Sequence, residues 1–311
     1  MTKGCVKIMA LALTLAALLG LSGCGGSSAG SGKVYYLSHN DTGTGFNEDL
    51  KQAFLAQAQA AGTSVEVLNA KNDSNTQLDN MNEAIDNGAA VIVLAAVDGE
   101  AIVPAVKKAN EAGVGIVRVN RDIADGKFVA SMSDDREAGI MQGEYMAKNL
   151  PQGAAVLYLG GEMTQGVARM RWEGFKEACL DKRPDIKLLA SADCSWNKAD
   201  ALKQMTLWLK VFQKVDAVVC ANDDMALGAV QALKDAGRLQ GVLISGVDAT
   251  APALKAVQAG TMSQTVMQDA KGQGEGAWKL VQAILSGEQP SQDLIVPFVS
   301  ITRDNIAQFL K

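Results

Sequence analysis

The chain has 311 residues, of which 48% are hydrophobic and 20% are charged, so it has enough apolar material for a folded core and is not a disordered sequence. Its formal net charge of −5 argues against a general binder of nucleic-acid backbones, which needs a concentrated basic surface. The single histidine argues against a histidine-rich metal site and a Ser-His-Asp triad. At roughly 100–200 residues per domain, the length predicts about two domains.

The N-terminus has the features of an export signal. Two lysines precede an apolar run over residues 8–21, which is shorter than the roughly 20 residues that a helix needs to span a bilayer. The small residues before Cys24 resemble the lipobox of bacterial lipoproteins, which implies cleavage of residues 1–23 and a lipid on Cys24. An ordinary secretory peptide is the alternative. Residues 24–32 are rich in glycine and serine and predict a flexible tether.

From residue 33 onward, short apolar runs alternate with longer amphipathic stretches. Apolar runs without polar alternation are typical of parallel strands buried on both faces, and the stretches between them predict crossover helices. In chain order, the pattern predicts strands at 34–38, 65–69, 91–95, 115–119, 154–160, 186–191, 217–220 and 242–247, and helices at 46–61, 75–86, 101–112, 169–180, 200–212 and 225–236.

This alternation predicts an α/β protein with doubly wound parallel sheets. The chain after the tether is too long for one open sheet of this kind, so we expect two lobes between which the chain crosses. A TIM barrel is the competing fold, because it also contains about eight strand–helix units in about 250 residues.

Polar residues follow the apolar runs directly, and ligands of open parallel sheets bind beyond the carboxyl ends of the strands. Such residues recur in both halves of the chain, so two facing lobes would bring them to one cleft. They are His39, Asn40, Asp41, Asp98, Asn120, Arg121, Asp122, Ser133, Asp134, Asn222, Asp223, Asp248 and Gln268.

Several segments resemble the periplasmic sugar-binding proteins of ABC transporters, in the ribose/galactose-binding branch. Their order and spacing carry the resemblance over nearly all of residues 33–311, and the stretch 196–209 is most similar to glucose/galactose-binding members. The segments are Val119–Asp122, Ser133–Gly143, Arg171–Phe175, Asn222–Ala229 and Gly246–Asp248.

The resemblance implies the type I periplasmic binding fold, with two lobes joined by a three-segment hinge. By position, the N-terminal lobe would comprise residues 33–134 plus 269–297, and the C-terminal lobe residues 135–268 plus 298–311. The implied function is binding without catalysis: the lobes close over a monosaccharide, a hexose such as galactose or glucose, and deliver it to an ABC permease. A cyclitol such as inositol, a pentose, and presentation to a chemoreceptor are the alternatives.

The resemblance also implies the partners. We expect a monomer held at the cell envelope by its lipid, with no nucleic-acid partner and no cofactor. The calcium loop of galactose-binding members has no counterpart between Lys148 and Ala154, so no metal is expected.

The ligand contacts that the resemblance implies have a chemical reason. A pyranose has C–H groups on its faces and hydroxyls around its rim, so aromatic rings would cover the faces and fixed polar groups would bind the rim. Phe46 and Trp196 are assigned to the faces. The residues assigned to the hydroxyls are Asn120, Arg121, Arg171, Asn222, Asp248 and Gln268.

These assignments have structural alternatives. The two aromatic residues could simply pack on apolar surface, and Arg171 could be a solvated helix charge. Arg121 could instead contact the backbone or the other lobe. Asn222 and Asp248 each precede a predicted helix, so each could be its N-cap.

Departures from the family pattern leave the ligand open. Glucose/galactose binders have an acid where this chain has Thr44, and a His and an Asp at Gln165 and Val167. Ribose binders have a second aromatic at Asn47 and an asparagine at Ala95. These differences favour a hexose or a cyclitol over a pentose.

Two other classes of protein are disfavoured. A transcriptional regulator with this effector fold would begin with a DNA-reading helix-turn-helix segment, where this chain has the export signal. An enzyme would need an activated nucleophile, and the one candidate, Cys194, has no base near it in the sequence. Cys220 ends an apolar run and is predicted to be a buried small hydrophobe.

Overall fold

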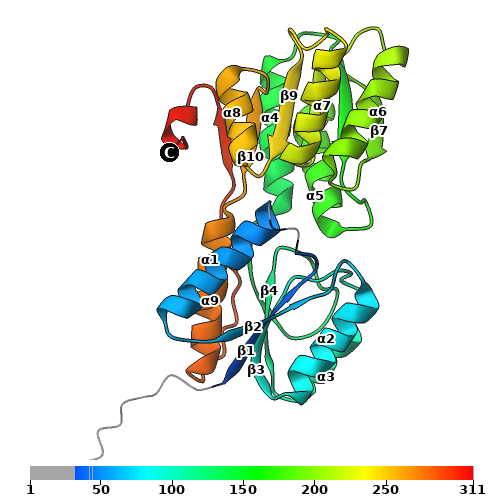
Figure 1. Ribbon diagram of the computed structural model, residues 1–311. Helices are drawn as coiled ribbons and strands as arrows, with labels where there is room; N and C mark the ends of the chain where they lie inside the picture. The colour runs from blue at the N-terminus through cyan, green and yellow to red at the C-terminus, as the bar shows by residue number, and fades with distance from the viewer. Residues whose placement is uncertain (1–31, 42, 44, 311) are drawn as a thin grey trace, which may run out of the picture.

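A computed structural model describes residues 32–41, 43 and 45–310. The expected export signal, Cys24, most of the tether and Thr44 lie outside these residues. The described chain folds into two lobes, each built on a six-stranded sheet, and one lobe is stacked on the other (Figure 1). Among these residues, no helix combines the length and the apolar character that a bilayer span requires.

Lobe 1 has a parallel sheet in the order β11-β5-β4-β3-β1-β2. Helices α1 and α9 cover one face, and α2 and α3 cover the other (Figure 1). The strands are β1 (Lys33–Ser38), β2 (Val65–Asn69), β3 (Ala89–Leu94), β4 (Gly115–Val119), β5 (Val129–Met132) and β11 (Leu294–Ile295), and the helices are α1 (Phe46–Ala60), α2 (Ser74–Asp86), α3 (Val103–Glu111) and α9 (Ala270–Leu285).

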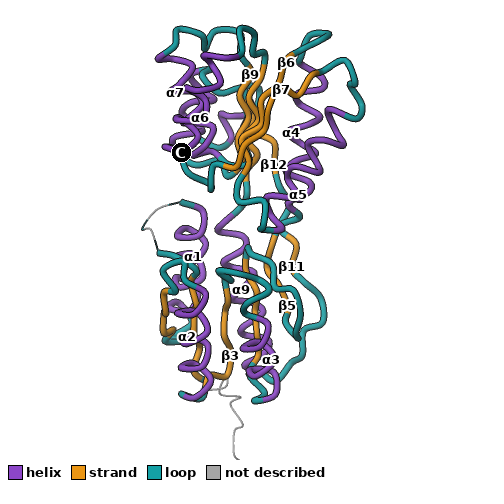
Figure 2. Tube along the Cα trace, turned by 90° about the vertical axis from the view of Figure 1, so that its right-hand side faces the viewer, coloured by secondary structure: helices purple, strands orange, loops and turns teal. Residues whose placement is uncertain are grey.

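Lobe 2 has a sheet in the order β12-β10-β9-β8-β6-β7, in which only β12 runs antiparallel to its neighbour. Helices α4 and α5 lie on one side of the sheet and α6 to α8 on the other (Figure 2). The strands are β6 (Ala155–Gly160), β7 (Lys187–Asp193), β8 (Ala217–Cys220), β9 (Leu243–Val247), β10 (Gln264–Met267) and β12 (Val299–Thr302). The helices are α4 (Asp135–Asn149), α5 (Gly166–Phe175, continued by a π-helical turn at Lys176–Leu180), α6 (Lys198–Val211), α7 (Asp223–Asp235) and α8 (Ala251–Ala259), and a 3₁₀ turn follows at Ile306–Gln308.

The chain passes between the lobes three times, from β5 to α4, from β10 to α9 and from β11 to β12. The prediction of an α/β fold with two doubly wound lobes and a three-segment hinge is therefore confirmed. The strands form two open sheets, which excludes the TIM barrel.

Several helix starts differ from the sequence prediction, and the elements that the pattern did not predict are α4, α8, α9, β5, β10, β11 and β12. Helix α3 begins at Val103 rather than at residue 101, because Pro104 occupies its first turn, where proline's missing N–H costs nothing. Helix α5 begins at Gly166, three residues before the predicted start, and Gln165 precedes it in an extended conformation.

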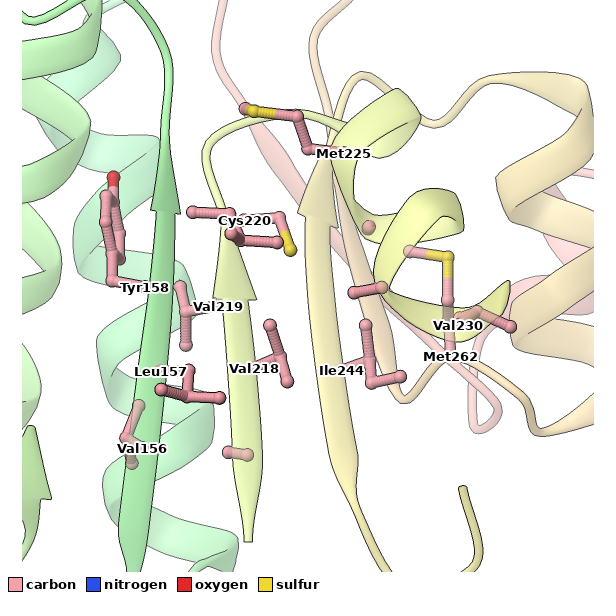
Figure 3. Packing of buried hydrophobic residues seen from close by; sticks show 14 of the residues in the cluster. Val156, Leu157, Tyr158, Val218, Val219, Cys220, Met225, Val230, Ile244 and Met262 are labelled. Carbon is pink, nitrogen blue, oxygen red and sulfur yellow. The ribbon is translucent and has the colours of Figure 1, made fainter. Parts of the chain in front are cut away.

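The core of lobe 2 shows why continuous apolar runs become central strands. All six residues of β6 are buried, since helices cover both faces of the sheet. Tyr158 is in register with Val219 of β8, and Leu157 with Val218, so each pair packs on its own face of the sheet (Figure 3). Cys220 has no solvent exposure, as predicted.

Candidate ligand-binding site

A cavity of about 330 Å³ lies between the two lobes, at the carboxyl ends of strands from both sheets. All eight residues assigned from the sequence line it. Lobe 1 contributes Phe46, Asn120 and Arg121. Lobe 2 contributes Arg171, Trp196, Asn222 and Asp248, and Gln268 comes from the crossing between β10 and α9.

Arg171 is a buried organising residue, not a solvated charge. Its side chain is only 3% exposed, and its Nη2 lies 2.7 Å from Oδ1 of Asp135. Nη1 donates to the carbonyl of Ala221 at 2.7 Å, and Nη2 donates to Oε1 of Gln268 at 2.9 Å. The guanidinium also lies over the ring of Trp196, 5.7 Å from its centroid. Most of its donors are thus satisfied by the protein itself, which fixes its position in the cavity wall.

The charges around Arg171 keep it ionised. Burial opposes the charged form, but the carboxylates of Asp135 and Asp248 outweigh burial and raise the pKa of Arg171 above its ordinary value. The guanidinium is therefore a permanent cation in the wall of the cavity, and its charge is compensated mainly by Asp135 at hydrogen-bonding distance.

Asp248 does not cap a helix. Thr250 is the N-cap of α8 and accepts the backbone N–H of Ala253, so the capping alternative for Asp248 is wrong. Among the described residues, the one ion-pair contact of Asp248 is Nη1 of Arg171, 4.0 Å from Oδ1. Burial raises the pKa of Asp248 well above its ordinary range, and Arg171 only partly offsets this. A partly buried carboxyl group with so few donors is suited to accept hydroxyls from a ligand.

Gln268 carries a second unused polar group. Its Oε1 accepts from Arg171, whereas its buried Nε2 has no hydrogen-bond partner among the described residues. Buried polar atoms in folded proteins are nearly always paired, so an unpaired donor in a cavity wall indicates that a ligand or water completes it.

Asn222 does act as an N-cap, but it still lines the cavity. Its Oδ1 accepts the N–H of Met225 at the start of α7, and its Nδ2 donates to the carbonyl of Trp196. One proton of the Nδ2 amide remains for another partner. The capping alternative and a position facing the ligand are therefore compatible for this residue.

Trp196 is held in place by two contacts. Its indole Nε1 donates to Oε1 of Gln165 at 3.0 Å. Its ring lies so close to Gly161 that any side chain there would collide with it. The alternative that Trp196 packs on apolar surface is partly correct, since it also contacts the core of lobe 2.

Lobe 1 contributes the opposite wall. Phe46 is the first residue of α1, and Asn120 donates from Nδ2 to the amide oxygen of Asn47. Nη1 of Arg121 makes a backbone contact with the carbonyl of Val97 at 3.3 Å. Burial lowers the pKa of Arg121, and Glu162 from the other lobe partly offsets this.

Strained backbone is concentrated at this cavity. Seven described non-glycine residues have positive φ angles, a conformation that costs energy for residues with a Cβ. Five of them line the cavity: Asn72, Asn120, Ser195, Trp196 and Asp248. The fold therefore maintains unfavourable conformations where the candidate ligand contacts lie.

Sequence analysis missed several polar residues of the wall, among them Asn72 and Glu162. Asn72 follows shortly after β2, and Glu162 follows shortly after β6. The strand-end rule, by which polar residues that follow a strand are candidate ligand contacts, therefore applies to them as well. Their loops carry no family segment, which is why they were passed over.

The candidate nucleophile is chemically inert. Burial raises the pKa of Cys194 to about 11, so the thiol stays protonated near neutral pH. Burial also lowers the pKa of His39 to about 3, which keeps this imidazole neutral. Within the described part of the chain, no group of three or more His, Cys, Asp or Glu side chains is placed to hold a metal ion.

Comparisons with known proteins agree with this geometry. A family profile described as "Periplasmic binding protein domain" matches residues 34–289. A "Putative rhizopine-binding protein" from Rhizobium meliloti is 32% identical over 80% of this chain and 82% of its own length. A "Xylitol-binding protein" from Mycolicibacterium smegmatis is 30% identical over 96% of this chain and 86% of its own length.

Solved structures also match this chain over most of its length. An ABC transporter solute-binding protein from Bacillus halodurans with bound myo-inositol superimposes with a TM-score of 0.84 at 29% identity, covering 91% of this chain and 98% of that one. A Caulobacter myo-inositol binding protein superimposes with the same TM-score of 0.84 at 26% identity, covering 89% of this chain and 95% of that one.

Proposed function

We propose that this chain, which belongs to the periplasmic binding protein family, is the solute-binding component of an ABC importer for a sugar or polyol with a six-membered ring. Proteins of this family bind solutes and are not enzymes, and membership implies an extracytoplasmic location. The ligand would be a hexose such as galactose or glucose, or a cyclitol such as inositol, with a pentose as the runner-up.

The observation that supports this proposal most strongly is the presence of a carboxyl group and an unpaired amide N–H beside an aromatic wall. The partly buried carboxyl group of Asp248 and the unpaired Nε2 of Gln268 face the same cavity, as do the rings of Trp196 and Phe46. A ligand with hydroxyls around its rim and C–H groups on its faces satisfies both features at once. A few charge-assisted bonds and two stacked faces are consistent with micromolar affinity, about −8 kcal/mol.

The proposed ring size rests on relatives and on one departure from the pattern of ribose binders. Two solved relatives at 29% and 26% identity were crystallised with myo-inositol. Relatives named for ribose import, for example one from Haemophilus influenzae at 32% identity over 89% of this chain, keep the pentose alternative open. Ala95 stands where ribose binders have an asparagine, which favours the larger ring.

Ligand transfer would follow from hinge closure. The cavity takes residues from both lobes, so a ligand binds the closed arrangement better than the open one and shifts the population towards it. A permease would then recognise the closed surface. We further propose that the protein acts as a monomer and is anchored through a lipid on Cys24. Presentation to a chemoreceptor would use the same closure.

A ligand panel tests the proposal. The mature protein is screened by thermal shift against galactose, glucose, ribose, xylitol and inositol isomers, and the ligands that stabilise it are titrated by calorimetry. We expect one-site binding of a hexose or an inositol at about micromolar affinity, with the ligand recovered unchanged. Tight binding of ribose alone would overturn the ring size. Binding of no member, or conversion of the ligand, would overturn the function.

A further inference from the structure

The N-terminus of α5 lacks a capping side chain from its own lobe. Gln165 occupies the N-cap position, but its side chain makes no capping hydrogen bond. Its amide is used elsewhere, because Oε1 accepts from Trp196 and Nε2 donates to Glu162. The first N–H groups of a helix have no partners within the helix and carry a partial positive charge, so this end of α5 favours a negatively charged neighbour.

That neighbour comes from the other lobe. The carboxylate of Asp122, in the loop after β4, lies directly against Gly166, the first residue of α5. A Cβ at Gly166 would collide with Oδ2 of Asp122, so only glycine admits the carboxylate at this point. Asp122 and Gly166 also line the second cavity of the cleft, which adjoins the first and is about 620 Å³ in volume.

A residue of its own lobe orients the Asp122 carboxylate towards α5. Nη1 of Arg118, whose side chain is only 8% exposed, donates to Oδ1 of Asp122 at 2.7 Å. The ring of Phe128 lies 5.6 Å below the guanidinium and fixes it further. This leaves Oδ2 facing the other lobe, where it meets the helix.

Helix α5 also carries Arg171, five residues after Gly166, and Arg171 organises Gln268 and the ring of Trp196. We propose that Asp122 is a positioning residue whose carboxylate faces the positive N-terminal end of α5 from the opposite lobe, without a hydrogen bond to the helix, so that lobe closure and the placement of Arg171 are coupled. The Asp122–Gly166 contact exists only while the lobes are together, so it favours the closed state by its own free energy. This inference rests on the proposed binding function, which it deepens.

Three variants separate the coupling from simple loss of stability. Asp122→Ala removes the carboxylate, and Gly166→Ala blocks its approach without changing any charge. Asp125→Asn is the matched control, since its carboxylate lies on the same loop and pairs with Lys107 of its own lobe at 2.5 Å. For each variant, the affinity and dissociation rate of the tightest panel ligand are measured, together with small-angle X-ray scattering with and without ligand.

We expect Asp122→Ala and Gly166→Ala to bind about fivefold more weakly, as loss of a favourable charge at a helix N-terminus implies, with faster dissociation. Their ligand-free radius of gyration should exceed that of the wild type and fall to the wild-type value on saturation, while Asp125→Asn matches the wild type throughout. A lower melting temperature with unchanged affinity and scattering would overturn the coupling. If the wild type bound no ligand, the proposed function would fail, whereas the ligand-free scattering would still test the contact.

Discussion

Arg171 and Asp135 form an ion pair of 2.7 Å in which the side chains are 3% and 2% exposed. Asp135 opens α4 and Arg171 lies in α5, so the pair joins the two helices that cover one face of lobe 2. The same guanidinium contacts Gln268 in the hinge crossing. Stability of the lobe and geometry of the cavity therefore depend on one buried charge pair.

Removing Asp135 should destabilise the protein severely. Asp135→Ala leaves the guanidinium of Arg171 buried without its main partner, and breaking such a pair costs about 3–5 kcal/mol. Urea unfolding measures the change in the free energy of unfolding. The control is Glu177→Ala, which breaks the exposed pair with Arg136 and should cost no more than about 1 kcal/mol. Equal effects of the two substitutions would contradict the role of the buried pair.

Ligand affinity should fall as the pH is lowered. Burial, followed by the neighbouring carboxylates of Asp223, Asp224 and Asp135, holds the pKa of ligand-free Asp248 well above its ordinary range, against the opposing effect of Arg171. Ligand hydroxyls that donate to the carboxylate stabilise its ionised form and lower that pKa. Binding therefore releases protons, and the dissociation constant should rise as the pH falls from above to below the pKa of ligand-free Asp248.

Calorimetry in buffers of different ionisation enthalpy measures this proton release. Asp248→Asn should bind more weakly and lose the pH dependence. His39 cannot produce the effect, because burial holds its pKa near 3 and it stays neutral over this range. An affinity that is constant with pH in the wild type would argue against a carboxylate that accepts ligand hydroxyls.

Trp196 should report ligand binding by fluorescence. Its ring lines the cavity, and its indole N–H is held by Gln165. Trp196→Phe should abolish most of the ligand-induced emission change. Trp196→Ala should weaken binding by at least about tenfold, the usual effect of removing a central aromatic contact.

The matched control is Trp278→Phe. Trp278 is buried in lobe 1 against Phe54, so this substitution should leave the ligand-induced change intact. A signal that survives in Trp196→Phe and disappears in Trp278→Phe would mean that the ligand lies elsewhere.

Helices α4 and α5 should tolerate no added side chain where they cross. A Cβ at Gly139 would meet the backbone carbonyl of Arg171, which cannot move without displacing the cavity wall. We expect Gly139→Ala to destabilise lobe 2 by about 1–3 kcal/mol, although alanine is the better helix former by about 1 kcal/mol. Glu144→Ala, on the exposed side of α4, should be nearly neutral. A stabilised Gly139→Ala protein would show that the helices can separate freely.

The strand-end rule explains why so much of the site could be predicted from sequence. Asn120, Asn222 and Asp248 each follow an apolar run directly. Apolar runs that alternate with helices form parallel strands, whose carboxyl ends meet at one edge of the sheet. Helix α4 was not predicted because it buries Asp135, Gly139 and Gln142 in place of an apolar stripe, so its hydrophobic periodicity is weak.

Contacts between the lobes were beyond sequence reasoning. Asp122 and Gly166 are brought together by the relative position of two separately folded lobes, and no local pattern encodes that position. Strand β11 has only two residues and β12 runs antiparallel at an edge, so neither carries the long apolar run that marked the central strands. The unsatisfied Nε2 of Gln268 likewise becomes visible only after every neighbouring acceptor has been placed.

The most direct measurement is a crystal structure of the protein grown with the panel ligand that binds most tightly. We expect one intact polyol ring between the lobes, with Trp196 covering one face. Its hydroxyls should accept a hydrogen bond from Nε2 of Gln268, donate to the carboxylate of Asp248, and contact Asn120 from the opposite lobe. A ligand that touches one lobe alone, occupies another surface or is chemically altered would contradict the central claim that this protein carries an unmodified polyol between its two lobes.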